Sequence, residues 1–178
     1  MKSNVFKART YNVNDVLLLR LPEHVSKELS TRGQVSVKGT INGYDFRTVL
    51  EPDGYLGHWM CIDDALQKST NIHADEYVDV RLEQIKDWPE PIVPEDLRTT
   101  LSTAPVAVQG MWDDITPMAR WEWVRWVNAT NNLDTRKHRV DVSISKMQHG
   151  KRRQCCFNLS ACTDPRVSKN GRLIELHE

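Results

Sequence analysis

The 178-residue sequence has no net charge and no long apolar segment, and each absence excludes a class of protein. Its 24 basic and 24 acidic side chains cancel, so no overall field attracts the chain to nucleic acid or to an anionic membrane. No segment approaches the roughly 20 apolar residues of a transmembrane helix, and the first residues lack the apolar run of a signal peptide. We therefore expect a cytoplasmic protein with no membrane partner.

The short motifs of common catalytic and cofactor sites are also missing. The sequence contains no phosphate-binding glycine-rich loop, no Gly-x-Ser-x-Gly elbow and no His-Glu-x-x-His segment. Its acidic pairs, such as Asp63-Asp64 and Asp113-Asp114, are adjacent in sequence. Adjacent acids are more typical of helix starts than of general acid and base catalysis. We therefore expect neither enzymatic activity nor a cofactor.

The first half of the chain is rich in β-branched and aromatic residues, in runs separated by turns. Asn42-Gly43 and Asp53-Gly54 supply the positive φ angles that tight hairpins require. Two short polar segments, Glu23–Arg32 and Asp63–Thr70, are long enough for about two helical turns each. The strand, helix, strand pattern occurs twice, and two such units can interleave into a closed six-stranded barrel. The predicted strands are Val5–Tyr11, Val16–Leu21, Gln34–Ile41, Tyr44–Leu50, His58–Ile62 and Tyr77–Ile85.

Three prolines within residues 89–94 stiffen the chain and mark a domain boundary. Beyond them the period becomes helical, with Leu97 and Leu101 spaced four apart, a helix from Thr116-Pro117 to about Ala129, and a helix from about Asp134 to Gly150. The sequence thus predicts an α+β protein with a barrel domain (1–88), a proline-rich join (89–94), a three-helix module (95–150) and a basic, cysteine-containing tail (151–178).

Several of these segments carry a family resemblance. The Pro94-Glu95-Asp96-Leu97 opening, the helix from Thr116-Pro117 to Trp126, and the segment Thr135–Val140 resemble the bacteriocin-protection (YdeI/OmpD-associated) family. Upstream, Leu21-Pro22, Asn42-Gly43 and Gly54-x-x-Gly57 resemble a small barrel domain of unknown function that often precedes it. The resemblance implies a double-split β-barrel, and it assigns no chemistry.

Basic residues concentrate in the second half of the chain. Residues 1–95 carry 11 basic and 15 acidic side chains, whereas the segment from Asp134 to Arg172 carries 10 and 3. Arginine binds phosphate and carboxylate in a bidentate fashion, and a helix N-terminus adds partial positive charge. An alternative is that Arg136 and Arg139 pair with acids and only fix the helices. The candidate anion-binding residues are Thr135, Arg136, His138, Arg139, Lys151, Arg152 and Arg153.

The tail also contains Cys155, Cys156 and Cys162. Their spacing does not suit zinc, because paired zinc ligands are usually separated by two to four residues and adjacent side chains point in opposite directions from an extended backbone. The three preceding cations would lower the pKa of an exposed Cys155 thiol. A redox thiol is therefore an alternative, and no metal site is expected.

These observations favour a non-catalytic binding or stress-tolerance protein whose basic surface, on the helical part, meets an unknown anionic ligand or protein partner. A nucleic-acid-binding regulator that uses the barrel is the first alternative. A thiol redox protein or another enzyme that uses the tail cysteines is the second.

Overall fold

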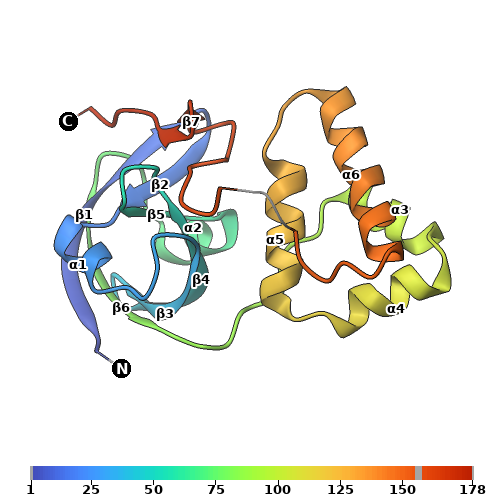
Figure 1. The fold of residues 1–178 in the computed structure, drawn as a ribbon. Coiled ribbons are helices and arrows are strands. Elements are labelled where there is room, and N and C mark those ends of the chain that lie inside the picture. The colour runs from blue at the N-terminus through green and yellow to red at the C-terminus, as the bar shows by residue number, and fades with distance from the viewer. Residues whose placement is uncertain (1, 155–157, 178) are drawn as a thin grey trace. The chain divides into compact units, whose positions relative to one another are not determined.

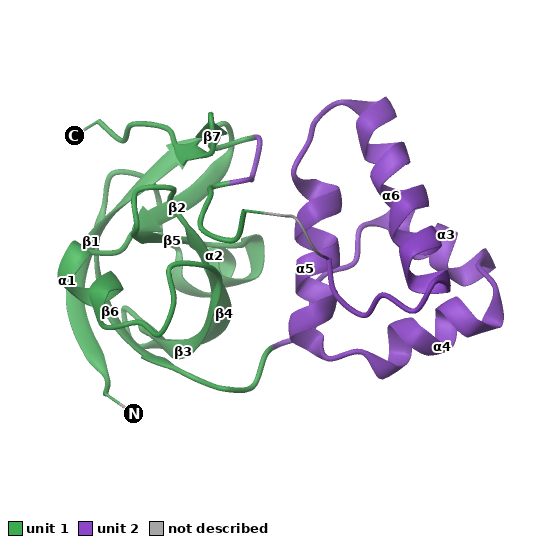
Figure 2. Cartoon of the chain, in the orientation of Figure 1, with its two compact units in different colours: residues 1–88, 158–162, 166–178 green, residues 89–157, 163–165 purple. Residues whose placement is uncertain are grey.

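The computed structural model describes residues 2–154 and 158–177, which form two compact units (Figure 2). Unit 1 comprises residues 1–88, 158–162 and 166–178, and unit 2 comprises residues 89–157 and 163–165. The C-terminal segment therefore belongs largely to the unit built by the first half of the chain. No helix in the described part of the chain combines the length and the apolar character needed to cross a membrane.

The strands of unit 1 close into an antiparallel barrel in the order β1-β2-β5-β4-β3-β6 (Figure 1). Helix α1 (Glu23–Lys27) follows β2, and helix α2 (Asp64–Thr70) follows β5. The predicted six-stranded barrel with two short helices is thus confirmed. Its strands are β1 (Asn4–Val13), β2 (Val16–Arg20), β3 (Val35–Ile41), β4 (Tyr44–Pro52), β5 (His58–Cys61) and β6 (Tyr77–Gln84).

Apolar side chains at every second position of the strands fill the barrel interior. Along β6, the buried Val78, Val80 and Leu82 alternate with exposed or half-buried residues, as expected for a strand with one face on a core. Asn42 and Gly43, with φ angles of 48° and 84°, form the predicted two-residue hairpin between β3 and β4. The second predicted tight hairpin is wrong, because five residues, 53–57, separate β4 from β5.

Strand β2 is buried on both faces, since all of residues 16–19 are apolar. Leu17 and Leu19 point into the barrel, while Val16 and Leu18 pack in a second cluster on its outer side. Trp59 of β5 belongs to the same outer cluster. The C-terminal segment covers this face with the short strands β7 (Ser168–Lys169) and β8 (Arg172–Leu173), which form a hairpin. The outer face of β2 explains why the tail returns to the barrel.

The described part of unit 2 holds four helices around an apolar core in which Leu97, Val108, Trp123 and Val127 are fully buried. The three predicted helices are present, but a fourth, α4, was not predicted. Pro105 ahead of it and Gly110 within it are typical of loops, yet a proline is tolerated at a helix start and burial of Val108 offsets the poor propensity of glycine. The helices are α3 (Glu95–Thr103), α4 (Val106–Asp114), α5 (Pro117–Asn128) and α6 (Leu133–Gln148).

Candidate functional site

The cations predicted to bind an anion on the helical part fall into two separate groups. Thr135, Arg136, His138 and Arg139 lie in the first two turns of α6, and residues 151–153 follow its last residue, Gln148. A helix of 16 residues is roughly 24 Å long at 1.5 Å per residue. One small anion therefore cannot contact both groups.

The two arginines at the start of α6 contact the end of α5. Arg136 donates from Nε and Nη2 to the Asp96 carboxylate at 2.6 and 3.1 Å, and from Nη1 to the carbonyl of Val127 at 3.4 Å. Arg139 donates from Nη1 to the carbonyl of Trp126 at 2.8 Å, and its guanidinium lies 5.4 Å from the centre of the Trp126 ring. The last carbonyls of a helix lack partners within it and carry partial negative charge. Both arginines therefore cap α5.

Electrostatics at this cap favour the ion pair. The hydrogen bond from Arg136 lowers the pKa of the Asp96 carboxyl, with smaller contributions from the backbone. The carboxyl is therefore ionised at neutral pH and attracts Arg136 rather than leaving it available to a ligand. Asp96 sits in the first turn of α3, so the pair connects three helices.

The arginines that follow α6 also have partners inside unit 2. Arg152 pairs with the Asp114 carboxylate at 2.7 Å and donates to the Asp114 carbonyl at 3.2 Å, at the end of α4. Arg153 binds both carboxylate oxygens of the buried Glu122, with 2.9 Å between Arg153 Nε and Glu122 Oε2. Glu122 in turn raises the pKa of the Arg153 guanidinium.

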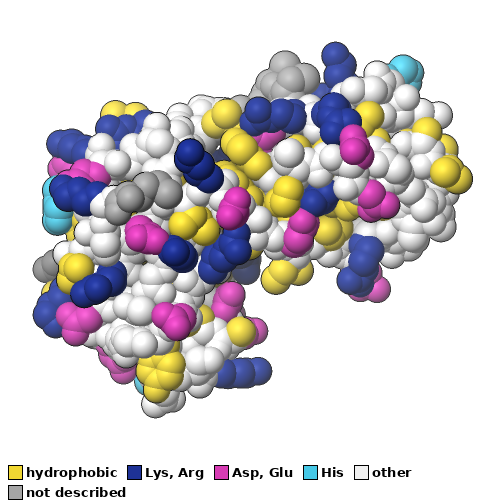
Figure 3. Space-filling view, turned by 90° about the horizontal axis from the view of Figure 1, so that it is seen from below, with side chains coloured by type: hydrophobic (Ala, Val, Ile, Leu, Met, Phe, Trp, Pro, Cys, Tyr) yellow, Lys and Arg dark blue, Asp and Glu magenta, His cyan; other side chains and the backbone are white. Residues whose placement is uncertain are grey.

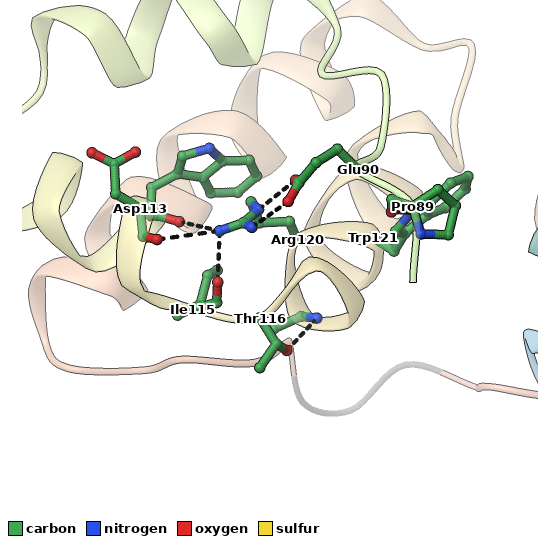
Figure 4. Close-up of polar contacts among 9 residues, drawn as sticks. Pro89, Glu90, Asp113, Ile115, Thr116, Arg120 and Trp121 are labelled. Atoms are coloured by element: carbon green, nitrogen blue, oxygen red, sulfur yellow. Dashed lines mark hydrogen bonds and ion pairs between the residues drawn. The ribbon is translucent and has the colours of Figure 1, made fainter. Parts of the chain in front are cut away.

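A further arginine of the same kind, Arg120 on α5, was not among the predicted residues (Figure 4). Its Nη1 donates to the carbonyls of Trp112 and Ile115 at 2.9 and 2.6 Å, and its Nε and Nη2 bind the Glu90 carboxylate at 2.8 and 2.6 Å. Arg120 thereby caps α4 as Arg136 and Arg139 cap α5. Nothing in the sequence distinguishes it, because its acidic partner lies 30 residues away.

Most predicted cations of the helical part thus serve its own structure. His138 and Lys151 are exposed, and no hydrogen bond or ion pair joins either side chain to another described residue. Basic and acidic side chains are interspersed on the face shown in Figure 3. The geometry favours the structural alternative for Arg136 and Arg139, and Arg152 and Arg153 likewise pair with acids of unit 2.

The predicted tail cysteines are Cys155, Cys156 and Cys162. Cys155 and Cys156 lie outside the described residues. Cys162 is 2% exposed and packs against Trp59, Val167 and Leu173, where an oxidant has little access to the thiol. Within residues 2–154 and 158–177, no three His, Cys, Asp or Glu side chains are grouped so as to hold a metal ion.

A different set of charged residues converges in unit 1, at the loop between β4 and β5. Asp53 begins this loop and is fully buried. Its Oδ1 accepts from the amides of Tyr55 and Gly57 at 2.7 and 2.8 Å, and its Oδ2 accepts from Nε of Arg20 at 2.8 Å and lies 2.7 Å from Nη2 of the same arginine in an ion pair. Both oxygens are therefore satisfied, and the carboxylate holds the loop in one conformation.

The glycines of the Gly54-x-x-Gly57 segment are required by this conformation. Gly54 has a φ of 79°, which disfavours any residue with a Cβ, and a Cβ at Gly57 would lie 2.6 Å from Oδ2 of Asp53. Between them, Leu56 adopts a φ of 70° although it is not glycine, and its side chain is 66% exposed. Such strained, exposed positions cluster at binding sites.

Beside the loop lies a hollow of about 540 Å³, whose other walls are the end of β2, helix α1 and Arg32. Three cations line it, namely Arg20, Lys27 and Arg32. The acids that line it are Glu23, which pairs with Lys27 at 2.5 Å, and the satisfied Asp53. The hollow therefore has a formal charge of +1, and the cation that no lining acid neutralises is Arg32.

Arg20 and Arg32 are each held by only part of their guanidinium. Arg20 uses Nε and Nη2 on Asp53, and Arg32 uses Nη1 on the carbonyls of Ser26 and Leu56, both at 3.2 Å. A guanidinium carries five N–H donors, so these contacts leave at least three donors on each arginine without a described acceptor. The two side chains are fixed in position and keep most of their binding capacity.

Behind the loop, His58 at the start of β5 is fully buried. Its Nε2 lies 3.0 Å from the carbonyl of Gly33, while its Nδ1 is buried with no hydrogen-bond partner among the described residues. Burial lowers the pKa of the imidazole, and the Gly33 carbonyl opposes that effect only in part. The ring is therefore neutral at pH 7, and it shapes the loop rather than adding charge to the hollow.

Comparison with protein families divides the chain near the same point, between residues 82 and 90. Residues 3–82 match the family described as a domain of unknown function, DUF1905. Residues 90–150 match the family described as bacteriocin-protection, YdeI or OmpD-associated. The two matched regions correspond to a DUF1905 domain followed by a YdeI/OmpD-associated domain. The resemblance predicted from the sequence is confirmed. No curated protein matches the chain.

The hollow and its arginines lie within the DUF1905 domain, and the capping arginines lie within the YdeI/OmpD-associated domain or directly after it. Sequence reasoning missed Arg20, Arg32 and Asp53. The only signal near them was the Gly54-x-x-Gly57 resemblance, because the three residues are spread over 33 positions and meet only when the barrel closes.

Proposed function

We propose that this protein is a non-catalytic binding protein that takes a small organic anion, a carboxylate or a phosphate ester, in the hollow beside the Asp53 loop of its DUF1905 barrel. One observation carries the proposal: Arg20 and Arg32 line the hollow and are held by protein contacts, and each keeps at least three N–H donors without an acceptor among the described residues. Immobilised arginines lose little conformational entropy on binding, and they pair with such groups in a bidentate fashion.

The remaining lining of the hollow supports binding rather than catalysis. Asp53 accepts three hydrogen bonds and is paired with Arg20, and Glu23 is paired with Lys27, so neither carboxylate is placed to act as a general base. No cysteine, serine or histidine is found among the described residues that line the hollow. Tyr55, whose ring lies 5.3 Å from the Arg20 guanidinium, adds an exposed aromatic wall for the organic part of a ligand.

The test is calorimetric titration of the full chain with inorganic phosphate and with citrate, at low and at high salt. Charge-assisted hydrogen bonds contribute about 1.5–3 kcal/mol each, so Arg32→Gln should weaken binding by about tenfold or more. Lys7→Gln, on the outer side of the barrel and paired only with Asp79, removes the same charge and should change the affinity by less than about twofold.

Two outcomes would replace this proposal. If Lys151→Gln weakens anion binding and Arg32→Gln does not, the anion binds the basic surface after α6, as the sequence suggested. If fluorescence polarisation shows tight binding of DNA or RNA oligonucleotides that weakens steeply with salt, a nucleic-acid-binding regulator is the better description.

A further inference from the structure

The C-terminal hairpin β7–β8 lies against the Asp53 loop, although it is far outside the residues that match the DUF1905 family. The amide of Leu173 donates to the carbonyl of Asp53 at 2.8 Å. A Cβ built on Gly54 would lie only 2.1 Å from the carbonyl oxygen of Gly171. The backbone of the hairpin therefore touches the backbone of the loop and leaves it no room to move outward.

The hairpin is itself firmly held by the barrel. Val167 and Leu173 are buried in the outer cluster with Trp59 and Leu18. Within the tail, the amide of Cys162 donates to the carbonyl of Gly171 at 2.8 Å, and the amide of Ile174 donates to the carbonyl of Val167 at 2.9 Å. These contacts make the hairpin a fixed support rather than a loose end.

A side chain of the hairpin also reaches the aromatic wall of the hollow. The guanidinium of Arg172 lies 5.2 Å from the centre of the Tyr55 ring, and that of Arg20 lies 5.3 Å from the same ring. Cations at this distance are attracted to a tyrosine ring. Arg172 is exposed and forms no ion pair with another described residue, so its contact with Tyr55 is its main interaction.

We propose that the C-terminal hairpin is a working part of the anion site: it fixes the Asp53 loop, and Arg172 is a positioning residue that holds Tyr55 at the mouth of the hollow. This inference rests on the proposed function for its ligand, but its structural half stands independently. The site of the DUF1905 domain is then completed by residues that follow the YdeI/OmpD-associated domain in the chain, which requires both ends of the protein to fold together.

The structural half is tested by amide hydrogen exchange in the full chain carrying Leu173→Ala. The amides of Tyr55 and Gly57, which donate to Asp53, should exchange at least about tenfold faster than in the unchanged protein. The amide of Val80, inside the barrel sheet, serves as the reference and should keep its rate. Unchanged rates at Tyr55 and Gly57 would show that the hairpin does not hold the loop.

The binding half is tested with Arg172→Met, which keeps a long side chain and removes the charge. The affinity for phenyl phosphate, whose ring can pack on Tyr55, should fall by about threefold to tenfold because Tyr55 is no longer held in place, while the urea midpoint should fall by less than about 0.5 M, as expected from loss of one exposed cation–π contact. Arg172→Lys should restore most of the affinity, and Lys169→Met, opposite Arg172 in the hairpin, should leave it unchanged. Equal losses of affinity in Arg172→Met and Lys169→Met would show that any nearby positive charge has the same effect, and would overturn the positioning role.

Failure of the two proposals can be told apart. If the unchanged protein binds neither phosphate nor citrate, the proposed function fails, and the exchange rates of Tyr55 and Gly57 alone decide whether the hairpin fixes the loop. If Leu173→Ala also accelerates Val80, the whole barrel is loosened. The rates of Tyr55 and Gly57 in Arg172→Met then decide: acceleration at these two amides alone supports the hairpin's role, and unchanged rates reject it.

Discussion

Replacing Arg136 and Arg139 together by alanine should destabilise the YdeI/OmpD-associated domain without affecting anion binding. Both side chains end on the last turn of α5, and Arg136 also binds Asp96 at the start of α3. Their removal exposes two helix carbonyls to weaker partners and leaves the Asp96 carboxylate without its cation. The double substitution therefore separates a structural role for these residues from the ligand-binding role that their sequence suggested.

The size of the effect follows from the individual contacts. The Arg136–Asp96 pair is partly exposed, at 23% and 41% for the two side chains, so it contributes about 1 kcal/mol. The carbonyl of Trp126, at 2.8 Å, accounts for about 1 kcal/mol, and that of Val127, at 3.4 Å, for about half as much. The cation–π contact with Trp126 adds about 0.5 kcal/mol. Together the loss is about 3 kcal/mol.

Urea unfolding followed by tryptophan fluorescence measures this loss, since the domain contains the buried Trp123. The free energy of unfolding of a unit of this size falls by about 1–1.5 kcal/mol for each molar of urea, so the urea midpoint should fall by about 2–3 M. Lys137→Ala with His138→Ala, on exposed positions of the same helix, is the matched control and should shift it by less than about 0.5 M. A double arginine variant with an unchanged midpoint and lost phosphate binding would refute the capping role.

Two further predictions concern the barrel. Gly54→Ala should destabilise the protein by about 2 kcal/mol more than Gly43→Ala, because both residues have positive φ but only Gly54 faces another backbone, at Gly171; urea midpoints of the two variants decide this. His58 has a folded pKa below its unfolded value of about 6.5, so the unfolded chain binds more protons and stability falls as the pH drops below that value. The unfolding free energy of His58→Gln should therefore decline less between pH 7 and pH 5.5 than that of the unchanged protein, and parallel declines would contradict it.

The barrel could be predicted from the sequence because its signals are local. Period-two alternation, as in Val78, Val80 and Leu82, and the Asn42-Gly43 turn each act within one or two strands. Helix α4 was missed because Pro105 and Gly110 are local signals of a loop, and the burial of Val108 that overrides them is a tertiary effect. Local signals also could not predict how the tail packs, because its packing depends on the outer face of β2.

The candidate site was harder to predict, because charge along the chain does not show which charges are already paired. The density of cations between Asp134 and Arg172 suggested a binding surface, yet Arg136, Arg139 and Arg153 are bound to Asp96, to a helix carbonyl and to Glu122. The hollow contains fewer cations than that segment, but its arginines keep N–H donors that have no described acceptor. Pairing of Arg20 with Asp53 across 33 residues is a property of the closed barrel, and no spacing rule in the sequence reveals it.

We propose that Arg20 and Arg32 bind the anion. The most direct test is a nuclear magnetic resonance titration with inorganic phosphate in which the Nε–Hε signals of assigned arginine side chains are followed. We predict saturable shifts of the Arg20 and Arg32 signals, with one common dissociation constant, while the signals of Arg136 and Arg153 stay in place. Saturable shifts of Arg136 or Arg153 with constant signals from Arg20 and Arg32 would contradict the account.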